Sequence, residues 1–128
     1  METRKTKTLV LGASTNPDRY SHMAVRMLRQ KGFEVVAVGP KTGRIGDIDI
    51  QPDITDEDSV DTVTLYLNPS NQEAYYEKIL KLKPRRVIFN PGTENPALER
   101  LAIQNGIQAQ RACTLVLLST GQFDGMAE

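Results

Sequence analysis

The feature that most constrains this chain is an early succession of strand, glycine loop, helix and second strand. Residues 8–11 form a continuous apolar run that ends at Gly12, as expected for a parallel strand buried on both faces. Ser21 can cap a helix with apolar residues at three- and four-residue spacing, which stops at Gly32. Residues 35–38 form a second strand and complete a βαβ unit of about 30 residues. The two strands are therefore predicted to pair in parallel.

The same alternation continues along the chain and sets the fold class. Further strands are predicted at 62–67, 87–89 and 107–112, with crossover helices over 71–82 and 96–105. Right-handed crossovers between such strands leave few arrangements other than a parallel sheet covered on both sides. The predicted fold is therefore α/β, a three-layer Rossmann-like fold with a parallel five-stranded sheet and helices on both faces.

Several local signals refine these elements. Asn95 is a suitable N-cap for the helix that begins at Pro96, and Gly106 ends that helix. Thr55 and Asp58 imitate a capping box and predict a short helical turn. The segments that stay ambiguous are 41–53, a loop with the option of a short strand around 48–50, and 115–118, either a strand extension or a final short helix.

Composition excludes several functional classes. With 128 residues we expect a single domain over 1–128, and the balance of 16 basic and 16 acidic residues argues against binding to nucleic acid or an anionic membrane surface. The longest apolar run is far too short to span a bilayer and the start lacks a signal peptide's apolar stretch, so we expect a cytoplasmic protein. One cysteine, Cys113, and one histidine, His22, cannot form an ordinary zinc cluster.

The first strand end is the strongest candidate for a binding site, because ligands of open α/β sheets gather outside the carboxyl ends of the strands. The loop after Leu11 offers a glycine for close approach, small side chains, polar hydrogens and the free N–H groups of a helix start, all suited to phosphate. An ordinary surface turn is the alternative. The candidate binding residues of this loop are Gly12, Ala13, Ser14, Thr15, Asn16, Arg19, Tyr20 and Ser21.

The second strand end, Gly39-Pro40-Lys41, bears on which nucleotide would bind. The first loop has only one of the three glycines of a GxGxxG fingerprint, and no acidic residue follows the second strand, where an NAD site would place one. A cation at Lys41 suits a phosphorylated ribose better, although a solvated lysine explains it equally well. Arg44 allows the same two interpretations with less support.

The third and fourth strand ends supply weaker candidates. Asn68 and Pro69, with the preceding Tyr66, offer an apolar wall for an adenine or a slender arm, although Tyr66 fits a core position better. Asn90 and Gly92 precede a helix, so a simple capping turn is the competing interpretation. His22 is favoured as a phosphate neighbour or solvated residue over an acid or base, and Cys113 as a small buried apolar group.

The chain resembles the small stand-alone CoA-binding proteins. The segments that carry this resemblance are 8–14, 16–17, 19–21, 36–41 and 67–69. Their domain is similar to the N-terminal CoA-binding domain of the succinyl-CoA synthetase α subunit. The resemblance continues weakly to Cys113 and departs from the family pattern at 90–94 and 114–123.

This resemblance implies coenzyme A as the cofactor. The diphosphate would lie on the loop from Gly12 to Ser21, the phosphorylated ribose near Lys41, and the adenine or pantetheine near Asn68 and Pro69, with the thiol toward 90–95. The synthetase uses a phosphohistidine in a second domain that has no counterpart in this sequence, so no ligase activity is implied.

Three functions remain open from the sequence. The first is binding of CoA or an acyl-CoA with no catalytic activity evident. The second is an enzyme that uses NAD or another adenine nucleotide, acting through His22 or Cys113. The third is a regulatory or scaffold subunit with a vestigial nucleotide site, which would bind a protein partner or a second copy of itself.

Overall fold

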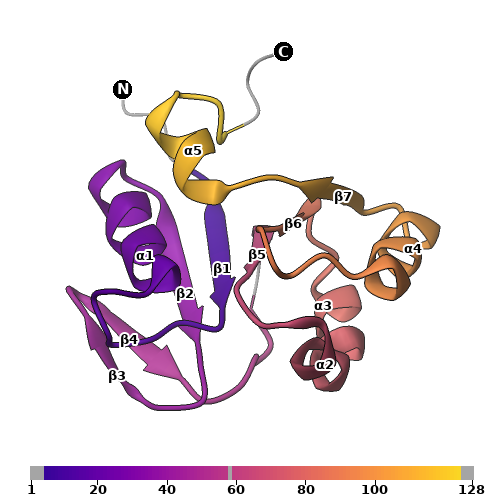
Figure 1. Ribbon diagram of the computed structural model, residues 1–128, viewed down its shortest axis with the longest axis horizontal. Helices are drawn as coiled ribbons and strands as arrows, with labels where there is room; N and C mark the ends of the chain where they lie inside the picture. Colours follow the sequence, from indigo (N-terminus) through magenta and orange to yellow (C-terminus); the bar gives the residue numbers. More distant parts are fainter. Residues whose placement is uncertain (1–4, 58, 125–128) are drawn as a thin grey trace.

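The computed structural model describes residues 5–57 and 59–124, so Asp58 of the predicted capping box lies outside the described residues. Its sheet has the strand order β3-β4-β2-β1-β5-β6-β7 (Figure 1). The strands are β1 (Lys7–Leu11), β2 (Glu34–Val38), β3 (Gly43–Ile45), β4 (Ile48–Gln51), β5 (Val60–Leu65), β6 (Arg86–Phe89) and β7 (Gln108–Arg111). The helical segments are α1 (Tyr20–Gln30), α2 (Pro69–Gln72), a 3₁₀ turn (Glu73–Tyr75), α3 (Tyr76–Leu82), α4 (Pro96–Gln104) and α5 (Thr114–Ser119).

The sheet is mostly parallel, and the prediction of five parallel strands was wrong in number. The ambiguous segment 41–53 forms a hairpin, in which β3 pairs antiparallel with β4 and β4 pairs in parallel with β2. Gly46 takes a left-handed backbone (φ 61°) in the hairpin turn. Ile45 and Ile50 are buried, so the hairpin extends the core beyond β2. The strand β4 corresponds to the optional short strand around 48–50, whereas β3 is too short and too polar to be indicated by the sequence.

The helices follow the predictions with local differences. Helix α1 begins at Tyr20, so Ser21 is not its cap; Arg19 is the residue before the first turn and makes no side-chain capping bond. Asn95 caps α4 as predicted, since its Oδ1 accepts from the N–H groups of Ala97 and Leu98. Residues 54–57 form no helical turn, and the Thr55 hydroxyl donates to the Glu57 carboxylate at 3.2 Å. Residues 114–119 resolve as the short helix α5.

Two apolar layers enclose the sheet. On one face α1 and α5 pack together over Val10, Ala37 and Ile88, with Leu28 and Leu118 from the helices (Figure 1). On the other face α3 and α4 cover a second cluster. The buried members of that cluster from β1, β5, β6 and the two helices are Leu9, Leu11, Val60, Val63, Leu65, Val87, Phe89, Ile79, Leu98 and Ala102. The central strands are buried on both faces, and their side chains point alternately into the two clusters, which produces the three layers.

Among the helices of the described residues, none combines the length and the apolar character needed to cross a membrane.

Candidate functional site

A cavity of about 730 Å³ lies outside the carboxyl ends of the central parallel strands. Its walls come from the loops that follow β1, β2, β5 and β6. Because the chain moves from β1 to β2 on one side and later returns to place β5 on the other, the cavity lies where the strand order reverses. The fold therefore places it at the usual ligand position of an open α/β sheet.

Most of the candidate residues line this cavity. Those in the lining are Gly12, Ala13, Ser14, Thr15, Arg19, Tyr20, Ser21, Pro40, Lys41, Asn68 and Gly92. Four others lie outside the lining: Asn16, Gly39, Pro69 and Asn90. The remaining lining residues are Asp18, Tyr66, Leu67, Pro91 and Thr93. Sequence reasoning missed Asp18, because an acidic residue is not the type expected beside phosphate.

The loop after β1 is held tightly against the end of β2. The N–H groups of Gly12 and Ala13 both donate to the Val38 carbonyl oxygen, at 2.8 and 2.9 Å. A Cβ atom on Gly39 would lie 2.2 Å from the Ala13 carbonyl oxygen, so only glycine fits there. The amides of Gly12 and Ala13 are therefore occupied, and these residues contribute shape to the cavity instead of anion donors.

Other N–H groups of this loop remain available. Among the described residues, nothing accepts from the backbone N–H groups of Ser14, Thr15, Tyr20 and Ser21. Ser14 Oγ accepts from the Asn16 N–H at 3.1 Å, which leaves the hydroxyl hydrogen free to donate. Two pairs of amides thus have no acceptor among the described residues, one in the loop and one in the first turn of α1, where the helix dipole favours an anion.

His22 supports this loop from beneath. It is 5% exposed, its Nδ1 lies 2.9 Å from the Ser14 carbonyl oxygen, and Arg26 Nε donates to its Nε2 at 3.0 Å. A guanidinium can only donate, so Nε2 accepts and Nδ1 carries the proton that it donates to Ser14. Both ring nitrogens are used in holding the loop, so His22 is neither a solvated residue nor a free acid or base.

The cavity carries two basic side chains on neighbouring loops. Arg19 and Lys41 are exposed in its lining and take part in no ion pair or side-chain hydrogen bond among the described residues. Arg44 is different, because it pairs with Asp49 at 3.0 Å across the β3–β4 hairpin and lies outside the lining. The site therefore has two unpaired cations beside its open amides.

Tyr66 forms part of the wall at the end of β5. Its hydroxyl is buried near the hydroxyls of Thr64 and Thr114 without reaching hydrogen-bond geometry with any described residue. Burial raises the pKa of the phenol to about 12. Tyr66 thus offers the cavity a ring surface, and its phenol stays protonated at neutral pH.

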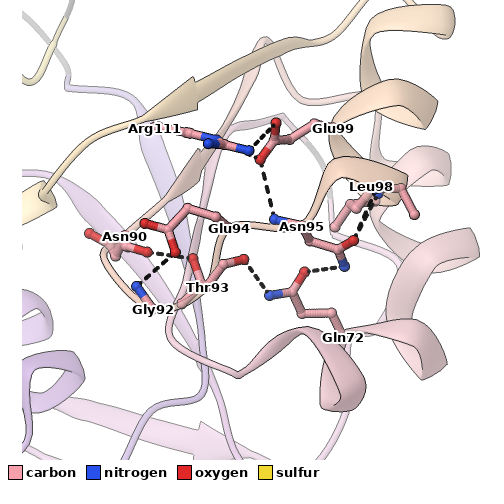
Figure 2. Close-up of polar contacts among 10 residues, drawn as sticks. Gln72, Asn90, Gly92, Thr93, Glu94, Asn95, Leu98, Glu99 and Arg111 are labelled. Carbon is pink, nitrogen blue, oxygen red and sulfur yellow. Dashed lines mark hydrogen bonds and ion pairs between the residues drawn. The ribbon is translucent and has the colours of Figure 1, made fainter.

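A buried polar network supports the loops after β5 and β6 (Figure 2). Gln72, which is fully buried, donates from Nε2 to the carbonyl oxygens of Leu67 and Thr93 at 2.9 and 2.8 Å. Its Oε1 accepts from Asn95 Nδ2 at 2.9 Å. Gln72 thus connects two loops that line the cavity. The sequence around Gln72 predicts a helix but gives no sign of this role.

Asn90 extends this network under the fourth loop. Its Nδ2 donates to Thr64 Oγ1 and to the Leu65 carbonyl oxygen, and its Oδ1 accepts from the Thr114 N–H. It is 2% exposed, so it positions the loop from behind. Cys113 is only partly buried, at the residue before α5, and lies outside the cavity lining.

Comparison with known proteins agrees with this geometry. An uncharacterized protein of known crystal structure is 47% identical, with a TM-score of 0.91 over 94% of this chain and 100% of the other. A Thermus thermophilus structure is 23% identical, with a TM-score of 0.82 over 93% of this chain and 91% of the other, and so shows a shared fold.

The fold also occurs within a larger enzyme. The dinucleotide-forming acetyl-coenzyme A synthetase of Ca. Korarchaeum cryptofilum, in complex with phosphate and ADP, is 20% identical. The match has a TM-score of 0.67 and covers 83% of this chain but 25% of the synthetase. No curated protein matches the sequence. The family model of the CoA binding domain matches residues 6–119, and the chain therefore belongs to the CoA-binding domain family.

Proposed function

We propose that this protein binds coenzyme A or an acyl-CoA in the cavity at the strand ends, through the loop from Gly12 to Ser21. The observation that carries the proposal is the combination of free amides and unpaired cations on two adjacent loops of a family member. A ligand with several phosphates provides the anions that such a wall would stabilise. The cavity volume of about 730 Å³ is in the range of small-molecule and cofactor sites.

The parts of the ligand follow from the chemistry of each wall. The diphosphate would accept from the N–H groups of Ser14, Thr15, Tyr20 and Ser21, with Arg19 as a charged donor. Lys41, on the next loop, would contact the phosphate of the ribose. The ring of Tyr66 and the side chain of Leu67 provide an apolar surface for the pantetheine arm, which would continue toward Gly92.

The proposal assigns no catalytic step to the chain. His22 uses both ring nitrogens to hold the loop, and the raised pKa of Tyr66 keeps its phenol protonated. An enzyme using NAD is the alternative, and no acidic residue lies in the lining beside Pro40 and Lys41 on the β2 loop to take ribose hydroxyls.

Calorimetric titration with CoA, dephospho-CoA and NAD tests the proposal. We expect CoA to bind most tightly and dephospho-CoA more weakly, because dephospho-CoA lacks the phosphate assigned to Lys41. In Lys41→Ala the difference between CoA and dephospho-CoA should shrink. Equally weak heats for all three ligands would overturn the proposal, and tighter binding of NAD would favour the enzyme alternative.

A further inference from the structure

The wall at the end of β6 carries a carboxylate. Gly92, in the cavity lining, has a left-handed backbone with φ 91°, a conformation that favours glycine. Its N–H donates to Oε1 of Glu94 at 2.9 Å. Figure 2 shows the Glu94 side chain folded back over the loop toward this amide. A negative charge is therefore held directly on a residue that lines the cavity.

The loop beneath this carboxylate is fixed by its neighbours. The Thr93 N–H and Oγ1 both donate to the Asn90 carbonyl oxygen, at 2.9 and 2.8 Å, and the Thr93 carbonyl oxygen accepts from Gln72. Thr93 and Asn90 are buried. Glu94 itself is exposed and lies outside the cavity lining, so the bond from the Gly92 N–H is what holds its carboxylate next to the β6 end of the cavity.

The charge on Glu94 has no cation bound to it. None of the ion pairs among the described residues includes Glu94. Arg111 is near enough to interact with it electrostatically, but its guanidinium makes two hydrogen bonds to Glu99, at 2.9 and 3.1 Å. The β6 end of the cavity is thus acidic, and Arg111 is already committed to another carboxylate.

The opposite end of the cavity is cationic. Arg19 and Lys41 belong to the loops after β1 and β2, together with one carboxylate, Asp18, next to Arg19 in the chain. The strands run β2, β1, β5, β6, so Gly92 lies three strand spacings from β2, or about 14 Å. A ligand with its phosphates at the cations and an extended arm across β5 would bring the end of that arm to Gly92 and Glu94.

On the basis of the proposed function, we infer that Glu94 makes this cavity select CoA compounds by the charge of the acyl group. Free CoA and esters of short uncharged acyl groups are accepted, and esters whose acyl group ends in a carboxylate are disfavoured. Such a carboxylate would meet the charge of Glu94 within a few ångströms and would find the Gly92 N–H already occupied. Glu94 is thus a specificity-determining residue.

Calorimetric titration of the intact protein with CoA, acetyl-CoA and succinyl-CoA tests this inference. We expect wild type to bind succinyl-CoA about three- to tenfold more weakly than acetyl-CoA, as one like-charge contact near the surface allows. In Glu94→Gln this ratio should fall below about twofold, with the affinity for CoA nearly unchanged, because the amide oxygen can still accept from Gly92. Glu77→Gln removes an exposed carboxylate on α3 that, unlike Glu94, makes no hydrogen bond to a described residue of the cavity lining, so it is the matched control and should keep the wild-type ratio.

Two results would overturn the inference while leaving the proposed function intact. One is equal affinity of wild type for acetyl-CoA and succinyl-CoA. The other is a discrimination that survives unchanged in Glu94→Gln. Failure of wild type to bind CoA and both esters would instead overturn the proposed function, and the inference with it.

Discussion

The two walls of the cavity use polar groups in opposite ways. On the β1–β2 side, the loop from Gly12 to Ser21 leaves amides and two cations open to a ligand. On the β5–β6 side, the buried side chains of Gln72, Asn90 and Asn95 use their polar atoms in bonds within the protein. The first wall is therefore built for binding, and the second for stability and position.

This difference shows how one small cavity can combine affinity for a ligand with a backbone that is fixed before the ligand binds. Open amides and unpaired charges stabilise nothing until a ligand arrives, whereas satisfied buried networks fix the backbone in advance. The two walls should accordingly respond differently to mutation. Changes in the open groups should alter affinity alone, and changes in the buried groups should first alter the free energy of unfolding.

The largest effect is expected from Gly39→Ala, at the close backbone contact between the loops after β1 and β2. The new methyl would lie 2.2 Å from the Ala13 carbonyl oxygen, so the loop after β1 must move away from β2. We expect a loss of about 3 kcal/mol in the free energy of unfolding, measured by urea denaturation, together with loss of CoA binding. Adding Ala13→Gly should rescue neither property, because the clash is with backbone. Wild-type affinity in Gly39→Ala would show that the loop position does not matter.

The second largest effect should come from Gln72→Leu on the buried wall. It removes the donor to Leu67 and Thr93, leaving one partly buried and one buried carbonyl oxygen without that partner. We expect unfolding to become easier by about 2 kcal/mol, with a smaller loss of CoA affinity. Gln104→Leu, on an exposed position of α4, is the control and should change stability little. If Gln72→Leu lost more free energy of CoA binding than free energy of unfolding, the proposed difference between the two walls would be wrong.

On the open wall, Arg19→Ala and Lys41→Ala should show the reverse pattern. Each removes a cation that has no ion-pair partner among the described residues, so unfolding should change by less than about 0.5 kcal/mol. CoA binding should weaken by about 1.5 kcal/mol in each variant if phosphates are engaged. Denaturation and titration of the same preparations compare the two quantities. Unchanged affinity in both variants would remove the phosphates from this wall.

The sequence predicted the open wall better than the buried one, for a physical reason. The strand, glycine loop and helix that form it are contiguous in the chain, so local patterns alone place the residues after Leu11 at one strand end. The position of Lys41 near this loop could also be predicted, because the parallel neighbouring strands β1 and β2 end at the same edge of the sheet. That the N–H groups of Gly12 and Ala13 are occupied could not be predicted locally, since their acceptor, the Val38 carbonyl oxygen, is supplied by pairing across the sheet.

The buried wall depends on contacts between distant residues. Gln72 lies 21 positions from Thr93, and Asn90 lies 24 from Thr114, so no local pattern shows that they meet. Of the β3–β4 hairpin, only the strand around 48–50 was predicted, and only as an option, for a related reason. Both strands are short, and Ile45 and Ile50 become part of the core only because β4 pairs with β2 and β3 pairs with β4. Each of these features depends on contacts between residues far apart in the chain, which a single sequence does not show.

Tyr66 lines the cavity with its ring and buries its hydroxyl, so it shares a feature with each wall. The substitution Tyr66→Phe should have the smallest effect. The ring that lines the cavity is kept, so CoA affinity should stay within about twofold. The hydroxyl that is removed has no hydrogen-bond partner among the described residues, so stability at pH 7 should be unchanged or should rise by up to about 1 kcal/mol. A hydroxyl that does bond to Thr114 in solution would instead give a loss of similar size.

The pH dependence of the same variant separates these outcomes further. Burial raises the pKa of Tyr66 from 10.0 in the unfolded chain to about 12 in the folded protein. The unfolded chain therefore releases this proton first, and the stabilisation associated with the raised pKa is complete below pH 10 and is lost as the pH rises toward about 12. Wild type should thus lose more stability than Tyr66→Phe between these pH values, as denaturation at each pH would measure. Parallel stability curves for the two proteins would mean that the phenol is not buried, and the wall at the end of β5 would then be as open as the loop after β1.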